Sequence, residues 1–90
     1  MYTVKPTTRF QKDLKLAAKR GYKIDLLTTA IKTFAAGKPL AESYKNHPLK
    51  GNYTGYLECH ITPDWLLIYE ISDKELILYL PRTGSHSDLF

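Results

Sequence analysis

All three histidines of this 90-residue chain, His47, His60 and His86, lie in its second half, each beside turn or loop residues. Imidazole titrates near neutral pH, so two histidines can serve as the base and the acid of a proton transfer. Histidines close to the ends of neighbouring strands suggest a shared site more strongly than any one of them does alone. The three residues therefore predict acid–base chemistry, provided that the fold brings their rings together.

Charged and aromatic residues near the C-terminus indicate the kind of substrate. Arg82 lies four residues before His86, and a guanidinium can neutralise the charge that grows on a phosphate. RNA supplies its own nucleophile, the 2′-hydroxyl, so histidines, Asp64 and an arginine suffice to break RNA without a metal ion. The terminal Phe90 can stack on a base if it lies beside them, although its residue type alone favours a place in the core. These residues favour a metal-independent ribonuclease.

Metal-dependent chemistry fits less well. Cys59 and His60 are adjacent on a predicted strand, so their side chains point to opposite faces and do not readily bind one ion. Two-metal catalysis needs several convergent carboxylates, and Glu58 and Asp64 are the only pair at a plausible site. The sequence therefore gives little support for a two-metal nuclease. We therefore expect no metal ion and no cofactor.

Serine hydrolase chemistry is also a poor fit. Ser85 adjoins His86, but no glycine pattern of a nucleophile elbow surrounds it. The dipeptide Gly84-Ser85 is more simply a turn.

Charge is divided unevenly along the chain, whose net charge is +4. Residues 1–51 hold 11 Lys and Arg against 3 Asp and Glu, whereas residues 52–90 hold 2 against 6. A positive face built from the first half would attract a polyanion such as nucleic acid, or an acidic protein. A solvated helix surface explains the same charges, and both interpretations stay open.

Length and composition indicate a single globular domain over residues 1–90. The chain is 43% hydrophobic and 24% charged, too apolar for a disordered protein. No apolar run approaches the ~20 residues of a membrane span, and the N-terminus lacks the core of a signal peptide. The single Cys59 cannot form an internal disulfide, which agrees with a reducing compartment. We expect a cytoplasmic protein with no membrane partner.

Periodicity predicts a strand and two helices in the first half. Residues 2–5 form a short strand, and Thr7 or Thr8 then caps a helix that runs to about Arg20 and stops at Gly21. A second helix fits residues 24–36, before Gly37. The apolar stripes of the two helices comprise Phe10, Leu14, Ala17 or Ala18, Leu27, Ile31 and Phe34.

The period changes to two in the second half, which predicts strands at residues 53–61, 65–71 and 75–80. In the first of these, Tyr56, Glu58 and His60 share one face, which we expect to point away from the core. The opposite face holds Leu57, Cys59 and Ile61. The prediction is an α+β fold in which an N-terminal edge strand and a three-strand meander form an antiparallel sheet, covered by the helical hairpin.

Two stretches resemble the YafQ branch of the RelE/ParE toxin superfamily: YKNHPLKGNYTGYLECHITPDWLLIYEI at residues 44–71 and RTGSHSDLF at residues 82–90. The spaced set HPLxG, ECHIxPDWLLIY and RTGSHSDLF is specific, and the helical hairpin and GKPL also fit. The resemblance implies a type II toxin that enters the ribosomal A site and cuts translated mRNA. It also implies a cognate antitoxin of the DinJ/RelB type, which blocks the toxin and represses the shared operon. The toxin would then contact operator DNA only through the antitoxin.

The resemblance also implies roles for particular residues. The matching catalytic positions are His47, His60, Asp64, His86 and Phe90, and the matching substrate-binding positions are Arg82, Lys50 and Glu58. The histidine nearest the C-terminus is implied to be the general acid for the 5′-leaving oxygen. The other histidines and Asp64 would activate the 2′-hydroxyl or stabilise the transition state, and the resemblance does not divide those tasks among them.

Two residues depart from the family pattern. Leu57 stands where many relatives have Arg, so we expect one substrate-facing charge to be absent. Pro81 precedes Arg82 where a strand residue is usual, and its missing N–H predicts a strand end or a bulge.

Two other functions stay open. The same superfamily contains ParE-like toxins that act on a protein such as gyrase without catalysis, because one fold can host both activities. The histidines and Asp64 favour the nuclease. A plain nucleic-acid-binding module that uses the basic helices is the weakest of the three hypotheses.

Overall fold

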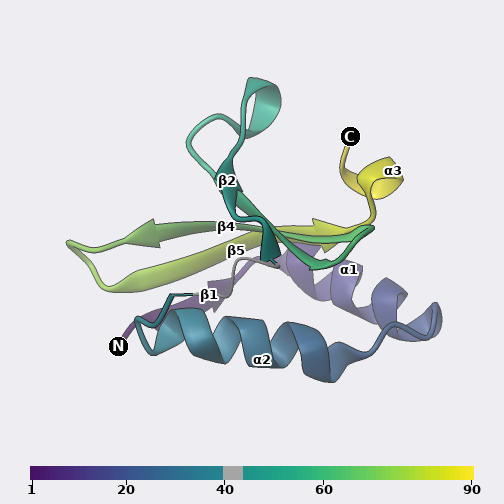
Figure 1. The fold of residues 1–90 in the computed structure, drawn as a ribbon, viewed down its shortest axis with the longest axis horizontal. Helices are drawn as coiled ribbons and strands as arrows, with labels where there is room; N and C mark the ends of the chain where they lie inside the picture. Colours follow the sequence, from purple (N-terminus) through teal and green to yellow (C-terminus); the bar gives the residue numbers. More distant parts are fainter. Residues whose placement is uncertain (40–43) are drawn as a thin grey trace.

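The computed structural model describes residues 1–39 and 44–90, so Leu40 of the GKPL motif lies outside the described residues. The elements follow the predicted order of strand, two helices and sheet (Figure 1). They are β1 (Thr3–Pro6), α1 (Thr8–Lys19), α2 (Ile24–Ala35), β2 (His47–Pro48), the 3₁₀ turn η2 (Gly51–Tyr53), β3 (Leu57–Thr62), β4 (Trp65–Ser72), β5 (Ile77–Gly84) and α3 (His86–Leu89).

Helix α1 begins at a side-chain cap. The hydroxyl of Thr7 accepts a hydrogen bond from the backbone N of Phe10 at 2.9 Å, which satisfies a donor that the helix itself leaves free. The helix buries Phe10 and Ala17, whereas Ala18 is exposed. The chain then turns through Gly21, whose φ of +81° lies in the left-handed region that favours glycine.

Helix α2 lies on the same side of the sheet as α1 (Figure 1). It buries Leu27, Ala30 and Phe34, and the partly buried Ile31 packs against the same core. The ring of Phe34 lies 4.3 Å from that of Tyr69 on β4. No helix within residues 1–39 and 44–90 has the length and apolar character needed to cross a membrane.

The sheet has five strands in the order β1-β5-β4-β3-β2. Strands β3, β4 and β5 form the predicted antiparallel meander, and β1 occupies an edge as expected. β1 pairs with β5 in parallel, with Thr3 opposite Ile77, so the sheet is mixed rather than wholly antiparallel.

Pro81 lies at a bulge, as the sequence predicted. Ile68 of β4 pairs with Arg82, whereas Glu70 pairs with Tyr79, so β5 has one residue more than β4 between these pairs. β5 continues beyond the bulge, further than the sequence indicated, and leads directly into α3.

The two faces of the sheet carry different apolar clusters. Helices α1 and α2 cover one face, while the turn η2 that follows β2 and helix α3 lie on the other (Figure 1). The main core between the sheet and the helices consists of Phe10, Ala17, Leu27, Phe34, Cys59, Trp65, Leu67, Tyr69, Leu78 and Leu80. The smaller cluster on the second face consists of Leu66, Ile68 and Leu89, with Leu49, Tyr53 and Tyr56 packed against it.

Side chains alternate along β3 as predicted, because Cys59 lies in the main core and Glu58 lies on the other face, away from that core. On that face Glu58 is only 4% exposed. The strand predicted at residues 53–61 is shorter, since Tyr53 ends the 3₁₀ turn η2 and β3 begins at Leu57.

Candidate active site

The three histidine rings form a row on the second face of the sheet. His47 comes from β2, His60 from β3 and His86 from the start of α3. The ring centroids of His47 and His60 are 6.1 Å apart, and those of His60 and His86 are 5.9 Å apart. The fold thus brings together residues that lie 39 positions apart in sequence (86 − 47), with His60 in the middle. We call these residues the histidine row.

One end of the histidine row is fixed by strand register. His47 is the direct antiparallel partner of Glu58, and its Nε2 lies 2.7 Å from Glu58 Oε2. His60 lies two residues further along the same face of β3, and its Nε2 is 3.9 Å from the same oxygen. The Glu58 side chain is 5% exposed and that of His47 is 48% exposed, so a substrate reaches the imidazole but not the carboxylate.

The other end of the row is an Asp–His pair. Asp64, in the turn between β3 and β4, accepts hydrogen bonds at Oδ1 from His86 Nδ1 at 2.9 Å and from the His86 backbone N at 3.3 Å. These bonds hold the pKa of Asp64 below its usual value. Because Nδ1 faces the carboxylate, Nε2 is the ring nitrogen that is free to meet a substrate.

Helix α3 carries His86 and is anchored at both ends. The Ser85 hydroxyl accepts from the backbone N of Asp88, and the Asp88 carboxylate accepts from the backbone N of Ser85, which forms a capping box. Ser85 is therefore a helix cap rather than the simple turn that we expected. Leu89 is 7% exposed and packs in the cluster with Leu66 and Ile68.

Phe90 does not lie in the core. It is 62% exposed, and its ring lies 5.5 Å from that of Tyr53 and 6.4 Å from that of His86. The interpretation from residue type, that Phe90 fills the core, is wrong because Leu89 takes that role. The aromatic face of Phe90 stands beside the histidine row, where it can meet a base.

Arg82 is held by a residue that the sequence did not single out. Its Nε and Nη2 donate to the two carboxylate oxygens of Asp13 on α1, at 2.8 and 3.0 Å. This bidentate pair raises the pKa of Arg82. Asp13 therefore fixes the position of the guanidinium.

Lys50 and Leu57, the remaining positions singled out from the sequence, lie further from the histidine row. Lys50 is exposed just before η2, and within the described chain no hydrogen bond or ion pair joins it to the histidine row. Leu57 packs against the main core, on the face of β3 opposite Glu58 and His60. The expected loss of one substrate-facing charge at Leu57 stays a prediction.

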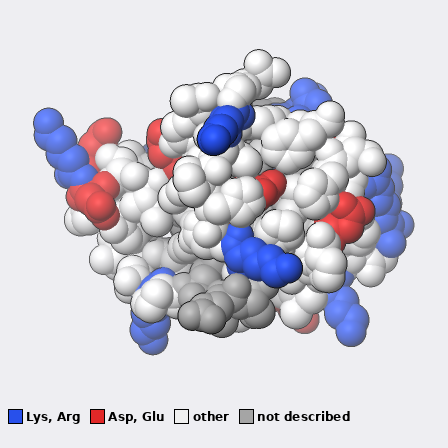
Figure 2. Space-filling model, turned by 45° about the horizontal axis from the view of Figure 1, so that its top comes forward, with Lys and Arg blue, Asp and Glu red and all other residues white. Residues whose placement is uncertain are grey.

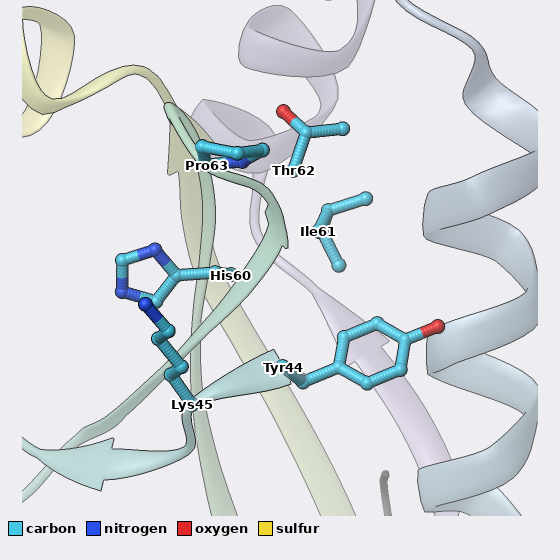
Figure 3. Close-up of a pocket in the computed structure, with 6 residues that line it drawn as sticks. All are labelled: Tyr44, Lys45, His60, Ile61, Thr62 and Pro63. Atoms are coloured by element: carbon cyan, nitrogen blue, oxygen red, sulfur yellow. The ribbon is translucent and has the colours of Figure 1, made fainter. Parts of the chain in front are cut away.

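A pocket of about 400 Å³ opens beside His60. Figure 3 shows the Lys45 side chain extending toward the His60 ring, while Ile61 points to the opposite side of β3. Lys45 adopts a φ of +48°, which is uncommon for a residue with a side chain. The lining residues are Tyr44, Lys45, His60, Ile61, Thr62 and Pro63.

Charged side chains are scattered over the face seen in Figure 2. Blue and red groups alternate around its rim, and no continuous basic surface appears there. Many of the basic residues of the first half lie on α1, namely Arg9, Lys12, Lys15 and Lys19, away from the histidine row. Both interpretations of the charge stay open for α1.

Sequence reasoning missed several residues that build the site: Asp13, Arg20, Lys45, Tyr53 and Asp88. One signal was readable, since the motif SHSD at residues 85–88 has the spacing of a capping box. The others depend on contacts between distant segments, which local patterns do not record.

The site contains groups able to hold a metal ion. One ligating atom each from His47, Glu58 and His60 lies within 4.8 Å of the other two. Cys59 and His60 point to opposite faces of β3, as predicted, whereas the pairing of β2 with β3 brings His47 to Glu58.

Comparison with known proteins identifies the family. Residues 2–90 match the family described as the bacterial toxin of type II toxin-antitoxin system, YafQ. The mRNA interferase toxin YafQ of Escherichia coli strain K12 is 42% identical over 86 residues, which cover 91% of this chain and 88% of that protein. The chain belongs to the YafQ family of toxins, which confirms the predicted family.

Solved structures show the same fold. The crystal structure of YafQ from E. coli strain BL21(DE3) has a TM-score of 0.92 at 36% identity, over 100% of this chain and 99% of that one. A metal-bound toxin from Helicobacter pylori has a TM-score of 0.92 at 46% identity, over 100% of both chains. YafQ in the E. coli DinJ–YafQ complex has a TM-score of 0.90 at 37% identity, over 100% and 99%. These structures confirm the predicted compact α+β fold.

Proposed function

We propose that this chain is an mRNA interferase that cuts RNA without a metal ion, by attack of a 2′-hydroxyl on the adjacent phosphodiester. The observation that carries this proposal is the histidine row with a carboxylate at each end, Glu58 beside His47 and Asp64 beside His86. The E. coli relative is named an mRNA interferase, which supports the same reaction class.

The row suits the geometry of phosphoryl transfer. In an in-line displacement the nucleophile and the leaving oxygen lie on opposite sides of the phosphorus, so the base and the acid must stand apart. His47 and His86 occupy the two ends of the row, and His60 lies between them. We assign His60 to the non-bridging phosphate oxygens, where an N–H stabilises the growing charge.

His47 takes the base role because it is the accessible member of its pair. Its Nε2 donates to the buried carboxylate of Glu58, 2.7 Å away, so Nδ1 accepts the proton of the 2′-hydroxyl and Glu58 stabilises the imidazolium that forms. Glu58 thereby acts through His47 rather than on the substrate.

His86 takes the acid role. Asp64 stabilises the protonated ring through Nδ1, and Nε2 delivers its proton to the 5′-oxygen as the P–O bond breaks. The new P–O bond to the 2′-oxygen makes a 2′,3′-cyclic phosphate, and the other fragment ends in a 5′-hydroxyl.

Residues around the row bind the RNA. Phe90 stacks on a base next to the scissile phosphate, because its exposed ring stands beside His86. Arg82 contributes positive charge from its fixed position on Asp13, and the exposed Lys50 contacts the RNA backbone.

The partners follow from the same proposal. A toxin of this kind acts in the cytoplasm, in the ribosomal A site, where mRNA is presented as a single strand. Because E. coli YafQ forms a complex with DinJ, we propose a DinJ/RelB-type antitoxin for this chain, and contact with operator DNA only through that antitoxin.

Expression in cells with primer extension on a reporter mRNA tests the proposal. We expect cuts with the wild type and with Ser87→Ala, a matched change at an exposed neighbour on α3, and none with His86→Ala. Equal growth arrest by wild type and His86→Ala with intact transcripts would contradict the nuclease and indicate a ParE-like toxin that acts on a protein.

A further inference from the structure

Asp13 is a largely buried carboxylate on a helix whose other charged residues are all basic. Its side chain is 9% exposed. Its two oxygens accept hydrogen bonds from Arg82 Nε at 2.8 Å, from Arg82 Nη2 at 3.0 Å and from the backbone N of Thr83 at 3.2 Å. The parallel pairing of β1 with β5 ends at Leu80, so Asp13 bonds to the part of β5 that follows. A buried charge needs a partner of opposite sign, and Arg82 supplies it.

Strand register places Arg82 on the face of the sheet that carries the histidine row. His47 pairs with Glu58 across β2 and β3. Glu58 pairs in turn with Ile68 of β4, and Ile68 pairs with Arg82 of β5. Residues directly opposite each other share a face, and neighbouring strands are about 4.8 Å apart, so Arg82 lies roughly 10 Å from Glu58 on the side away from His47. Arg82 therefore belongs to the end of the row at which His86 lies.

The bonds to Asp13 leave a second edge of the guanidinium available. Asp13 occupies the edge formed by Nε and Nη2. The N–H groups of Nη1 and the remaining N–H of Nη2 form another edge, which matches two oxygens of a phosphate. The Arg82 side chain is 16% exposed, so an anion can still contact it. An arginine that is fixed in advance loses less conformational freedom when a phosphate binds than a free arginine does.

We propose that Asp13 is a positioning residue and that it holds Arg82 as a binding site for one particular phosphate of the RNA, the one directly 3′ of the scissile phosphate. This inference rests on the proposed function, in which His60 contacts the scissile phosphate and His86 protonates the 5′-leaving oxygen. β4 separates His60 from Arg82, and Arg82 lies at the leaving-group end of the row. The phosphate nearest to Arg82 is therefore the next one along the leaving strand.

An RNA with one uncharged phosphate tests this site. A short mRNA in the ribosomal A site carries a single methylphosphonate directly 3′ of the scissile phosphate, and its cleavage is compared with that of the unmodified mRNA. We expect the wild type to cut the modified RNA about tenfold more slowly, because a charge-assisted pair is lost. Asp13→Asn and Arg82→Ala should cut the unmodified RNA about tenfold more slowly, and the modification should slow them by less than about a further twofold. A loss caused by ribosomal contacts would instead persist in both variants.

Controls separate positioning from stability. Asp25→Asn on α2 makes the same chemical change at an exposed site and should match the wild type on both RNAs. The thermal unfolding of each variant is measured, and cleavage is assayed well below its Tm. A purely structural role for Asp13 would lower the Tm of Asp13→Asn but leave its full sensitivity to the methylphosphonate. If Asp13→Asn does not fold, Arg82→Lys, which keeps the charge but loses the planar fork, should lose most of that sensitivity.

The outcomes distinguish this inference from the proposed function. Equal cleavage of the two RNAs by the wild type would overturn the phosphate site and leave the nuclease intact. Sensitivity of Asp13→Asn equal to that of the wild type would overturn the positioning role. A wild type that leaves the unmodified RNA uncut would contradict the proposed function and, with it, this inference.

Discussion

The guanidinium of Arg20, directly after α1, donates to both carboxylate oxygens of Asp88 in α3, at 2.6 and 3.1 Å. Asp88 Oδ2 also accepts from the backbone N of Ser85 at 2.9 Å. Helix α3 has only 4 residues, too few to be stable by itself, so these contacts position the segment that carries His86 and Phe90.

Loss of this contact should reduce activity more than stability. Arg20→Ala should slow RNA cleavage by about tenfold, because small displacements of a catalytic group are costly. The free energy of unfolding should fall only slightly, since the pair is partly exposed and screened by solvent. Cleavage kinetics and urea unfolding measure the two effects. The exposed Arg9→Ala on the same helix is the control, and wild-type kinetics for Arg20→Ala would contradict the positioning role.

The same pair predicts how stability depends on pH. The hydrogen bond from Arg20, followed by that from the Ser85 backbone, lowers the pKa of Asp88 in the folded state. A lowered pKa stabilises the fold above the unfolded value of about 3.9, and this stabilisation is lost as the pH falls through the folded pKa. Unfolding measured from pH 7 downward should therefore show the wild type losing its advantage over Asp88→Asn below about pH 4. A constant difference across that range would be inconsistent with the lowered pKa.

Substitutions of Leu89 and Phe90 should distinguish the contribution of packing to stability from the contribution of substrate binding to cleavage. Leu89→Ala removes a side chain that is 7% exposed and should lower the free energy of unfolding by about 2 kcal/mol or more. Phe90→Ala removes a ring that is 62% exposed and should leave stability nearly unchanged while slowing cleavage at least tenfold. Deletion of both residues should abolish cleavage while the main core survives. A doubly truncated protein that cuts at the wild-type rate would exclude a role for this end of the chain.

A buried hydrogen-bond chain should stabilise the junction of β4 and β5. Trp65 Nε1 donates to the Thr83 hydroxyl at 3.0 Å, and that hydroxyl donates to the Leu66 carbonyl at 2.6 Å. Thr83→Val leaves both partners buried without a bond and should cost about 1–3 kcal/mol of unfolding free energy. Denaturant unfolding measures this cost, with the exposed Thr28→Val on α2 as control. Equal stability of the two variants would mean that the chain contributes nothing.

Most of the fold was predicted from local patterns, because helix caps, helix stops and bulges depend on residues that are neighbours in sequence. The cap at Thr7, the stop at Gly21 and the bulge at Pro81 each follow from the chemistry of one residue. The parallel pairing of β1 with β5 does not, because it joins segments separated by the whole helical hairpin and three strands.

The residue types of the candidate site could be read from the sequence, but their burial could not. The sequence singled out the histidines, Asp64 and Phe90, but it did not show that Glu58 is buried, and residue type alone favoured the core for Phe90, which is exposed. The second cluster, on the far face of the sheet, joins Leu66 and Ile68 of β4 to Leu89 of α3. Because it combines two separate elements, no single stretch of sequence displays it.

The central claim is that the histidine row moves protons while the 2′-hydroxyl of the RNA performs the attack. The most direct measurement compares an RNA with the same RNA carrying one 2′-deoxynucleotide at the scissile position, followed by analysis of the product ends. We predict that the deoxy-substituted strand stays uncut at that position and that the normal strand yields 2′,3′-cyclic phosphate and 5′-hydroxyl ends. Cleavage of the deoxy-substituted strand, or products that end in 5′-phosphate, would contradict the account.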